Sequence, residues 1–131
     1  MFDHIALGTS HMQNSRKFYD AALKPLGLKR LFDDADLASG YGIDRPIFWI
    51  VIPSDEKNAS VGNGTHLAFA APSRRAVNEF HAQALAAGGL DHGAPELCPE
   101  YGENHYAAYV FDPDGHKIEA VTRLPEKQPL T

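Results

Sequence analysis

Residues 4–28, HIALGTSHMQNSRKFYDAALKPLGL, return 62 positions later as residues 66–90, HLAFAAPSRRAVNEFHAQALAAGGL. The two segments align without a gap, and each begins with a histidine, His4 in the first and His66 in the second. The matching positions are mostly apolar residues and glycines: Ile5 with Leu67, Ala6 with Ala68, Phe18 with Phe80, Ala22 with Ala84, Leu23 with Leu85, Gly27 with Gly89 and Leu28 with Leu90. Self-similarity at a fixed interval indicates a structure built from two copies of one unit.

Each copy begins with an apolar strand and continues into a helix. The strands are predicted over about residues 2–8 and 64–71. Apolar side chains then recur at helical spacing: Met12, Tyr19, Ala22, Leu23 and Leu26 in the first copy, and Val77, Phe80, Ala84 and Leu85 in the second. Ser10 with Gln13 predicts a capping box, and Ser73 predicts the second N-cap. Glycines at 27 and at 88–89 predict the ends of the helices.

Three strands are predicted after each helix. They are LKRLFDD, LASGYGI and PIFWIVI in the first half, and APELC, YAAYVFD and KIEAV in the second. The DPDG turn between the last two favours a tight reversal, because Pro113 fixes φ and Gly115 adopts conformations that other residues resist. The sequence therefore predicts an α+β fold of two βαβββ modules. One module cannot bury its sheet alone, so the two must pack together, within one chain or across a dimer.

A single domain over residues 1–123 accommodates both copies. Module 1 is predicted at about residues 1–53, a polar linker at 54–63 and module 2 at about 64–123. Residues 124–131 form a predicted C-terminal tail. The full chain of 131 residues, with 44% apolar residues, is long enough to bury a core of its own.

Composition narrows the class of ligand. A net charge of −5 argues against a binding surface for nucleic acid or anionic lipid. We expect no membrane partner, because no apolar run approaches the roughly 20 residues of a membrane span. The opening MFDHIAL lacks the features of a signal peptide, which predicts a cytoplasmic protein. The single cysteine, Cys98, is expected to be a buried thiol without a catalytic role. A small molecule is the expected partner.

The ends of the copies align with a shift of 70, which pairs Asp44 with Asp114, Trp49 with Glu119 and Val51 with Val121. Four equivalent positions on the first and last strands are then occupied by His4, Trp49, His66 and Glu119. Strand alternation alone allows Glu119 to face water together with Lys117. Packing of the copies about a pseudo-twofold axis would instead bring the four positions to one place.

Two histidines and a carboxylate form a typical ligand set for divalent iron, manganese, nickel, cobalt or zinc. The repeat therefore predicts a metal site at His4, His66 and Glu119, with Glu119 also the candidate catalytic residue. Aromatic and polar side chains nearby are candidates for a substrate pocket, although ordinary core or strand positions also suit them: Trp49, Phe48, Tyr41, Tyr106, Tyr109 and Asn104. His105 and His116 flank the closing hairpin. We expect both to be solvated, although their positions would also allow them to reach the pocket.

The paired modules, the opening histidines and DPDGHKIE resemble the vicinal oxygen chelate superfamily over nearly all of residues 1–123. This superfamily includes glyoxalase I, extradiol dioxygenases, fosfomycin-resistance enzymes and bleomycin-resistance proteins. The resemblance implies curved sheets that form a cup with helices outside it, a homodimer, and metal ligation by His4, His66 and Glu119. Glyoxalase I typically has a fourth ligand, a glutamate, where this chain has Trp49, so the set is closer to the dioxygenase and fosfomycin types.

Two functions follow from the resemblance. One is a metal-dependent lyase, transferase or oxygenase acting on a small molecule with two adjacent oxygens. The alternative is a metal-free protein that binds or sequesters a small molecule, of the bleomycin-resistance type. Metal content distinguishes the two.

Overall fold

The computed structural model describes residues 1–126, so part of the predicted tail, residues 127–131, lies outside the described residues. The elements of the first half are β1 (Ile5–Gly8), α1 (Met12–Leu23), the 3-10 helix η1 (Lys24–Leu26), β2 (Lys29–Asp34), β3 (Ala38–Gly42) and β4 (Pro46–Val51). Those of the second half are β5 (His66–Ala70), α2 (Arg74–Ala86), β6 (Leu90–Leu97), the 3-10 helix η2 (Pro99–Tyr101), β7 (Tyr106–Phe111) and β8 (Lys117–Thr122).

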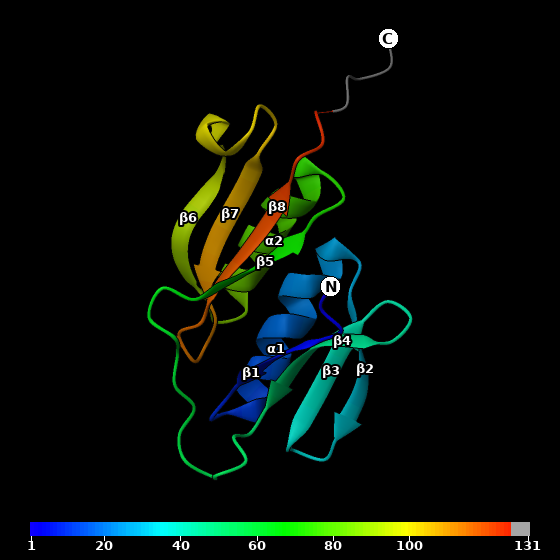
Figure 1. Ribbon diagram of the computed structural model, residues 1–131, viewed down its shortest axis with the longest axis vertical. Helices are drawn as coiled ribbons and strands as arrows, with labels where there is room; N and C mark the ends of the chain where they lie inside the picture. Colours follow the sequence, from blue (N-terminus) through cyan, green and yellow to red (C-terminus); the bar gives the residue numbers. More distant parts are fainter. Residues whose placement is uncertain (127–131) are drawn as a thin grey trace.

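Each half forms its own four-stranded sheet, with strand orders β1-β4-β3-β2 and β5-β8-β7-β6. The first strand of each sheet is parallel to the last, and the other neighbours are antiparallel. Figure 1 shows the two sheets in separate parts of the molecule, with the linker before β5 running along one side. The predicted α+β fold of two βαβββ modules is confirmed.

The strand register reproduces both sequence shifts. Ala6 of β1 is paired with Trp49 of β4, and Ala68 of β5 is paired with Glu119 of β8. Ala6 and Ala68 are 62 residues apart in the sequence, and Trp49 and Glu119 are 70 residues apart. Trp49 and Glu119 therefore occupy the same place in their modules. His4 and His66 each lie two residues before the alanine, His4 just before β1 and His66 at the start of β5.

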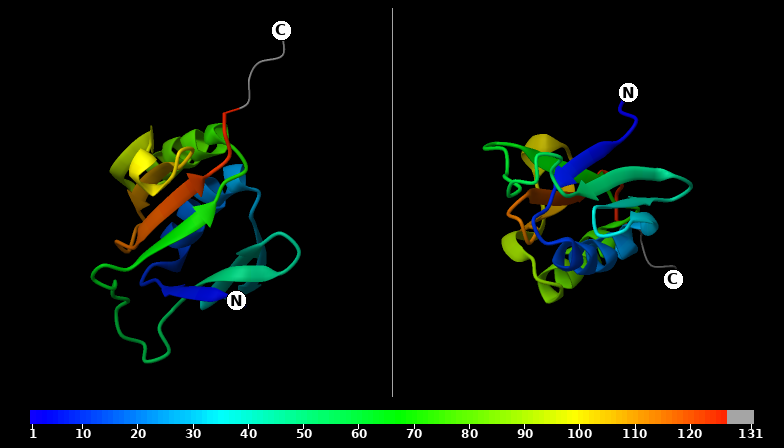
Figure 2. Two further views of the ribbon diagram at one scale, coloured as in Figure 1. Left: turned by 45° about the horizontal axis from the view of Figure 1, so that its top comes forward. Right: turned by 90° about the horizontal axis from the view of Figure 1, so that it is seen from below.

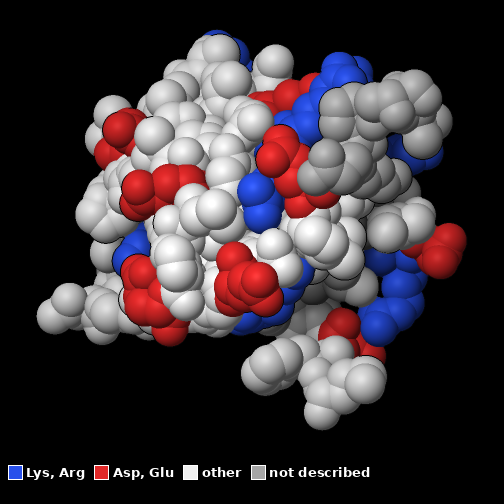
Figure 3. All heavy atoms as spheres, turned by 90° about the horizontal axis from the view of Figure 1, so that it is seen from above, with Lys and Arg blue, Asp and Glu red and all other residues white. Residues whose placement is uncertain are grey.

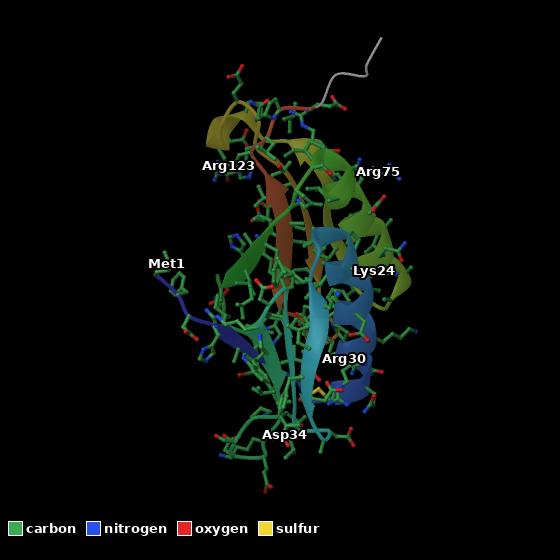
Figure 4. All side chains as sticks on the ribbon, turned by 90° about the vertical axis from the view of Figure 1, so that its right-hand side faces the viewer. Met1, Lys24, Arg30, Asp34, Arg75 and Arg123 are labelled. Atoms are coloured by element: carbon green, nitrogen blue, oxygen red, sulfur yellow. The ribbon has the colours of Figure 1, made fainter. Side chains whose placement is uncertain are left out.

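Both helices lie on the same side of the molecule and cover one face of the two sheets (Figures 2 and 4). The largest fully buried apolar side chains of both modules meet there: Phe18, Tyr19, Leu23, Tyr41, Phe48, Ile50, Val77, Phe80, Val110 and Ile118. Phe48 of module 1 packs edge-on against Phe69 of module 2, with ring centroids 5.2 Å apart. One core therefore joins the modules. Among residues 1–126, no helix covers the opposite face of either sheet, which we call the open face.

The helix starts differ between the modules. Ser73 caps α2 as predicted, because its hydroxyl accepts a hydrogen bond from the Ala76 N–H at 3.1 Å. The capping box predicted at Ser10 and Gln13 is wrong: the N-cap of α1 is His11, without a side-chain cap. The Ser10 hydroxyl instead accepts a hydrogen bond from the Ala59 N–H of the linker at 2.8 Å.

The DPDG turn of module 2 docks onto module 1. The Tyr19 hydroxyl donates to Asp112 Oδ2 at 2.5 Å, and burial raises the pKa of the Asp112 carboxyl. His116 was expected to be solvated, but it is buried and donates from Nε2 to the Gly8 carbonyl at 2.7 Å. Gly115 closes the turn at φ 94°, a left-handed conformation that favours glycine. The turn therefore acts as a contact between modules as well as a reversal.

Asp114 of this turn supplies acceptors near the start of α1. Its carboxylate accepts hydrogen bonds from the Ser10 N–H at 2.9 Å and from the Ser15 hydroxyl at 3.2 Å. A carboxylate at a helix N-terminus satisfies exposed donors and complements the helix dipole. Module 2 thus stabilises the helix of module 1.

We expect Asp114→Ala to lower the free energy of unfolding by about 1 kcal/mol, because its hydrogen bonds to Ser10 and Ser15 are lost. The matched control is Asp44→Ala, at the equivalent turn of module 1, where the side chain is exposed and forms no hydrogen bond among the described residues. Urea unfolding followed by circular dichroism measures both. Equal midpoints for the two variants would contradict the assigned role of Asp114.

Within residues 1–126, no helix has both the length and the apolar character needed to cross a membrane. Acidic and basic side chains are interspersed on the upper end of the molecule, and neither sign dominates among the described residues visible there (Figure 3). This face therefore lacks the clustered basic side chains that bind a phosphate backbone.

Candidate functional site

The open face of module 2 brings two of the predicted ligands together. Glu119 is 4% exposed, although it lies on the face that no helix covers. His66 extends from the edge strand β5, and its Nε2 lies 3.0 Å from Glu119 Oε1. The alternative in which Glu119 simply faces water does not describe this structure. A buried carboxylate requires a partner, and His66 supplies one.

The His66 and Glu119 pair has the spacing of two adjacent metal ligands. Two atoms that each lie about 2.1 Å from one ion at a right angle are themselves about 3.0 Å apart. The side chain of His66 is 41% exposed, so the pair is accessible from the open face. The donor types also fit a divalent ion. The pair therefore fits as part of a metal site and leaves further positions for other ligands.

His4 lies apart from this pair, in module 1. Its side chain is 55% exposed, and its Nδ1 lies 2.7 Å from Asp3 Oδ1. Within residues 1–126 of one chain, no three His, Cys, Asp or Glu side chains form a group that could hold a metal ion. The two histidines occupy equivalent places in their own modules but do not share a site within one chain.

A cavity of about 490 Å³ surrounds Glu119, lined by His66, Ala68, Tyr101, His105, Tyr109, Lys117, Glu119, Val121 and Arg123. Tyr109 is paired with Glu119 across β7 and β8. Burial and the nearby Glu119 carboxylate raise the pKa of the Tyr109 phenol to about 12. The phenol therefore keeps its proton at neutral pH. The Lys117 ammonium lies 5.0 Å from the centre of the Tyr109 ring, within the range of a cation–π contact.

His105 also lines this cavity, which is the alternative to the solvated position favoured by the sequence. It is buried, and its Nε2 lies 3.7 Å from Glu119 Oε2. Side chains two residues apart in an extended chain point to the same side, so residues 105, 107 and 109 share one side. His105 therefore points to the same side as Tyr109. That spacing is the sequence signal that identifies His105.

On the open face of module 1, the apolar Trp49 occupies the position at which module 2 carries the Glu119 carboxylate. Trp49 packs edge-on against Phe32, with ring centroids 5.9 Å apart, and Ile47 of the same strand is exposed. Glycine is required at position 40, because a Cβ there would lie 2.9 Å from the Trp49 ring. Trp49 is thus held flat against β3, on the face where a pocket wall was predicted.

Two other predicted pocket residues lie on the helix-covered side. Tyr41 and Phe48 are fully buried, and the Tyr41 hydroxyl donates to Asp20 Oδ1 at 2.8 Å. The expectation that they line a pocket is therefore corrected. They alternate with Gly40 and Trp49 along their strands, so they face the core.

Tyr106 and Asn104 are also directed toward α2. The Tyr106 hydroxyl donates to Asn78 Oδ1 at 2.7 Å, and the Asn104 side chain accepts from Arg74 Nη2 at 3.3 Å. Of the predicted aromatic pocket residues, Tyr109 and Trp49 remain on the open faces. Burial, together with nearby carboxylates, raises the pKa of the Cys98 thiol.

Comparisons with known proteins agree with this architecture. A family model described as "Glyoxalase/Bleomycin resistance protein/Dioxygenase superfamily" matches residues 1–120. The uncharacterized protein YqjT of Bacillus subtilis (strain 168) is 32% identical over 127 residues, covering 90% of this chain and 95% of that protein.

Solved structures show the same relationship. A glyoxalase/bleomycin resistance protein from Albidiferax ferrireducens T118 superposes with a TM-score of 0.84 and 35% identity, covering 95% of this chain and 99% of that one. Lactoylglutathione lyase from Agrobacterium tumefaciens shares the fold, with a TM-score of 0.65, 17% identity and coverage of 93% and 92%. This chain belongs to the Glyoxalase/Bleomycin resistance protein/Dioxygenase superfamily.

Proposed function

We propose that the protein is a divalent-metal-dependent enzyme of the lyase, transferase or oxygenase type, acting on a small molecule with adjacent oxygen atoms. The observation that carries this proposal is the pair of His66 Nε2 and Glu119 Oε1, 3.0 Å apart beside an accessible cavity. The substrate class comes from the superfamily, and the residue roles come from the geometry of this chain.

A homodimer completes the proposed site. His4 of one copy would join His66 and Glu119 of the other, because one chain holds the first histidine apart from the pair. The open faces support this arrangement: module 1 presents Trp49 and the exposed Ile47, and module 2 presents the cavity. Exposed apolar side chains on an uncovered sheet are typical of a face that another subunit covers.

Each residue then has a definite role. When bound, the metal ion supplies positive charge that stabilises negative charge developing on substrate oxygens. His66 and Glu119 hold two of its positions. Tyr109 keeps its phenolic proton and donates a hydrogen bond to a substrate oxygen in the same cavity, since its pKa is raised to about 12.

A metal-free binding protein is the second candidate, and one observation favours it. His66 and Glu119 already satisfy each other as a hydrogen-bonded pair, so the carboxylate does not depend on a cation for a partner. In that case the cavity around Tyr101 and Tyr109 would bind its ligand through aromatic contacts.

We expect elemental analysis of protein purified without chelator or nickel resin to find about one divalent ion per chain, since a homodimer would hold two equivalent sites. Light scattering of the same sample should give the mass of a dimer. A metal-free dimer would favour the binding protein. A monomer that retains its metal would contradict a site shared between copies.

A further inference from the structure

His105 stands out among the histidines because it is buried and has no hydrogen-bond partner. It is 6% exposed, and within residues 1–126 neither Nδ1 nor Nε2 forms a hydrogen bond. Its backbone is fixed, since its N–H donates to the Gly102 carbonyl at 3.1 Å and its carbonyl accepts from the Cys98 N–H at 2.7 Å. Buried polar side chains nearly always have a partner, so this imidazole requires an explanation.

The polar atom that His105 faces is the second oxygen of Glu119. His105 Nε2 lies 3.7 Å from Glu119 Oε2, whereas His66 Nε2 lies 3.0 Å from Oε1. The Tyr101 ring packs against His105 with centroids 5.3 Å apart. The carboxylate therefore lies between two imidazoles, one accessible at the cavity and one buried.

The distance from His105 is slightly too long for a hydrogen bond. A bond from an imidazole N–H to a carboxylate measures about 2.8 Å, so the two atoms need to approach by about 0.9 Å. Rotation of the Glu119 side chain supplies a shift of this size. Carboxylates that bind metal ions are commonly held by such outer hydrogen bonds, which fix their orientation.

We propose that His105 is a positioning residue for Glu119: its Nε2–H holds Oε2, so that Oε1 stays directed at His66 and the cavity. The contact itself does not depend on a metal. Its consequence for metal affinity rests on the proposed function. His105 acts through Glu119 and is not proposed as a metal ligand.

The contact is tested in metal-free protein by long-range ¹H–¹⁵N NMR of the histidine side chains. We expect His105 to carry its proton on Nε2, and we expect its ring signals to shift in Glu119→Gln. Lys117→Gln, on the same strand and the same face, is the matched control and should leave them in place. Ring signals of His105 that are identical in wild type and Glu119→Gln would overturn the proposal.

The consequence is tested by calorimetric titration with Co²⁺, together with the visible absorption of bound Co²⁺. Loss of an outer hydrogen bond weakens metal binding by about 10- to 100-fold, which is the loss expected for His105→Leu. His105→Gln keeps an N–H donor and should restore most of the affinity and the wild-type spectrum. His81→Leu, which removes a histidine bonded to Asp91 instead, controls for general effects on module 2.

The outcomes separate the two proposals. Equal affinity of wild type and His105→Leu, or equal weakening by His105→Gln and His105→Leu, would show that the ring only fills space and would overturn the positioning role. Wild-type protein that binds no Co²⁺ would refute the metal-dependent function, and the NMR comparison alone would then decide whether His105 holds Glu119.

Discussion

Glu119→Gln is expected to lower the affinity for Co²⁺ by at least about 100-fold, because loss of a direct charged ligand should exceed the 10- to 100-fold effect of an outer-shell change. The amide has nearly the shape of the carboxylate but lacks its charge. Calorimetric titration of the purified protein measures the change. The fold should remain intact, since Glu119 lies on the open face and the core beneath it consists of Ile118 and Ala120.

Lys117→Gln is the matched control for this experiment. Lys117 lies on the same strand and the same face, but its ammonium contacts the Tyr109 ring. Within residues 1–126 it forms no hydrogen bond or ion pair with His66 or Glu119. We expect the Co²⁺ affinity of this variant to stay within about threefold of wild type, as for a screened surface charge. Equal affinity in Glu119→Gln and wild type would remove Glu119 from the ligand set and leave the His66 contact as an ordinary ion pair.

Repetition made the fold predictable. The sequence repeats with a shift of 62 residues on the first strands and of 70 on the last strands. The strand pairs Ala6 with Trp49 and Ala68 with Glu119 show the same two shifts. A register error of one residue would have turned Glu119 toward the core. The prediction that Glu119 meets a histidine thus depended on the repeat and not on any property of Glu119 alone.

The errors fall where contacts between the modules decide the outcome. Ser10 and Gln13 fit the capping pattern, but Ser10 is bonded elsewhere. Its N–H donates to Asp114, and its hydroxyl accepts from the Ala59 N–H. His116 looked like a hairpin residue in solvent, yet it bonds to the Gly8 carbonyl. Hydrogen bonds between residues so distant in sequence leave no local periodic signal.

The pocket residues were mistaken for a different reason. Tyr41 and Phe48 were grouped with Trp49 because all are aromatic, although alternation along β4 directs Phe48 and Trp49 to opposite faces. The same alternation places His105 and Tyr109, four residues apart, on one side of the chain. Strand parity, used consistently, excludes Tyr41, Phe48 and Tyr106 from the pocket and adds His105 to it.

The position of His4 leads to the second large effect. One chain holds His66 and Glu119 together but keeps His4 in the other module, next to Asp3. If His4 of one copy and the His66–Glu119 pair of the other form one site, variants of two different chains can complement each other. Two variants damaged in different modules should restore one complete site when they form a mixed dimer.

We therefore expect His4→Ala and Glu119→Gln each to bind Co²⁺ weakly alone, and a refolded equimolar mixture of the two to regain tight binding. In a mixed dimer, one site receives both lesions and the other receives neither. Random pairing makes about half of the dimers mixed, so about one quarter of all sites should recover wild-type affinity. Calorimetric titration of the mixture measures this fraction.

The control mixture combines His66→Ala with Glu119→Gln. Both lesions lie in module 2, so every site in every dimer keeps one of them, and no tight binding should return. Native mass spectrometry of chains with different tags verifies that mixed dimers have formed. If mixed dimers of His4→Ala and Glu119→Gln form but bind no more Co²⁺ than the control mixture, His4 does not complete the site of a second copy. Recovery only in the first mixture would assign His4 to one subunit and His66 with Glu119 to the other, because no arrangement within one chain regains a ligand by exchanging partners.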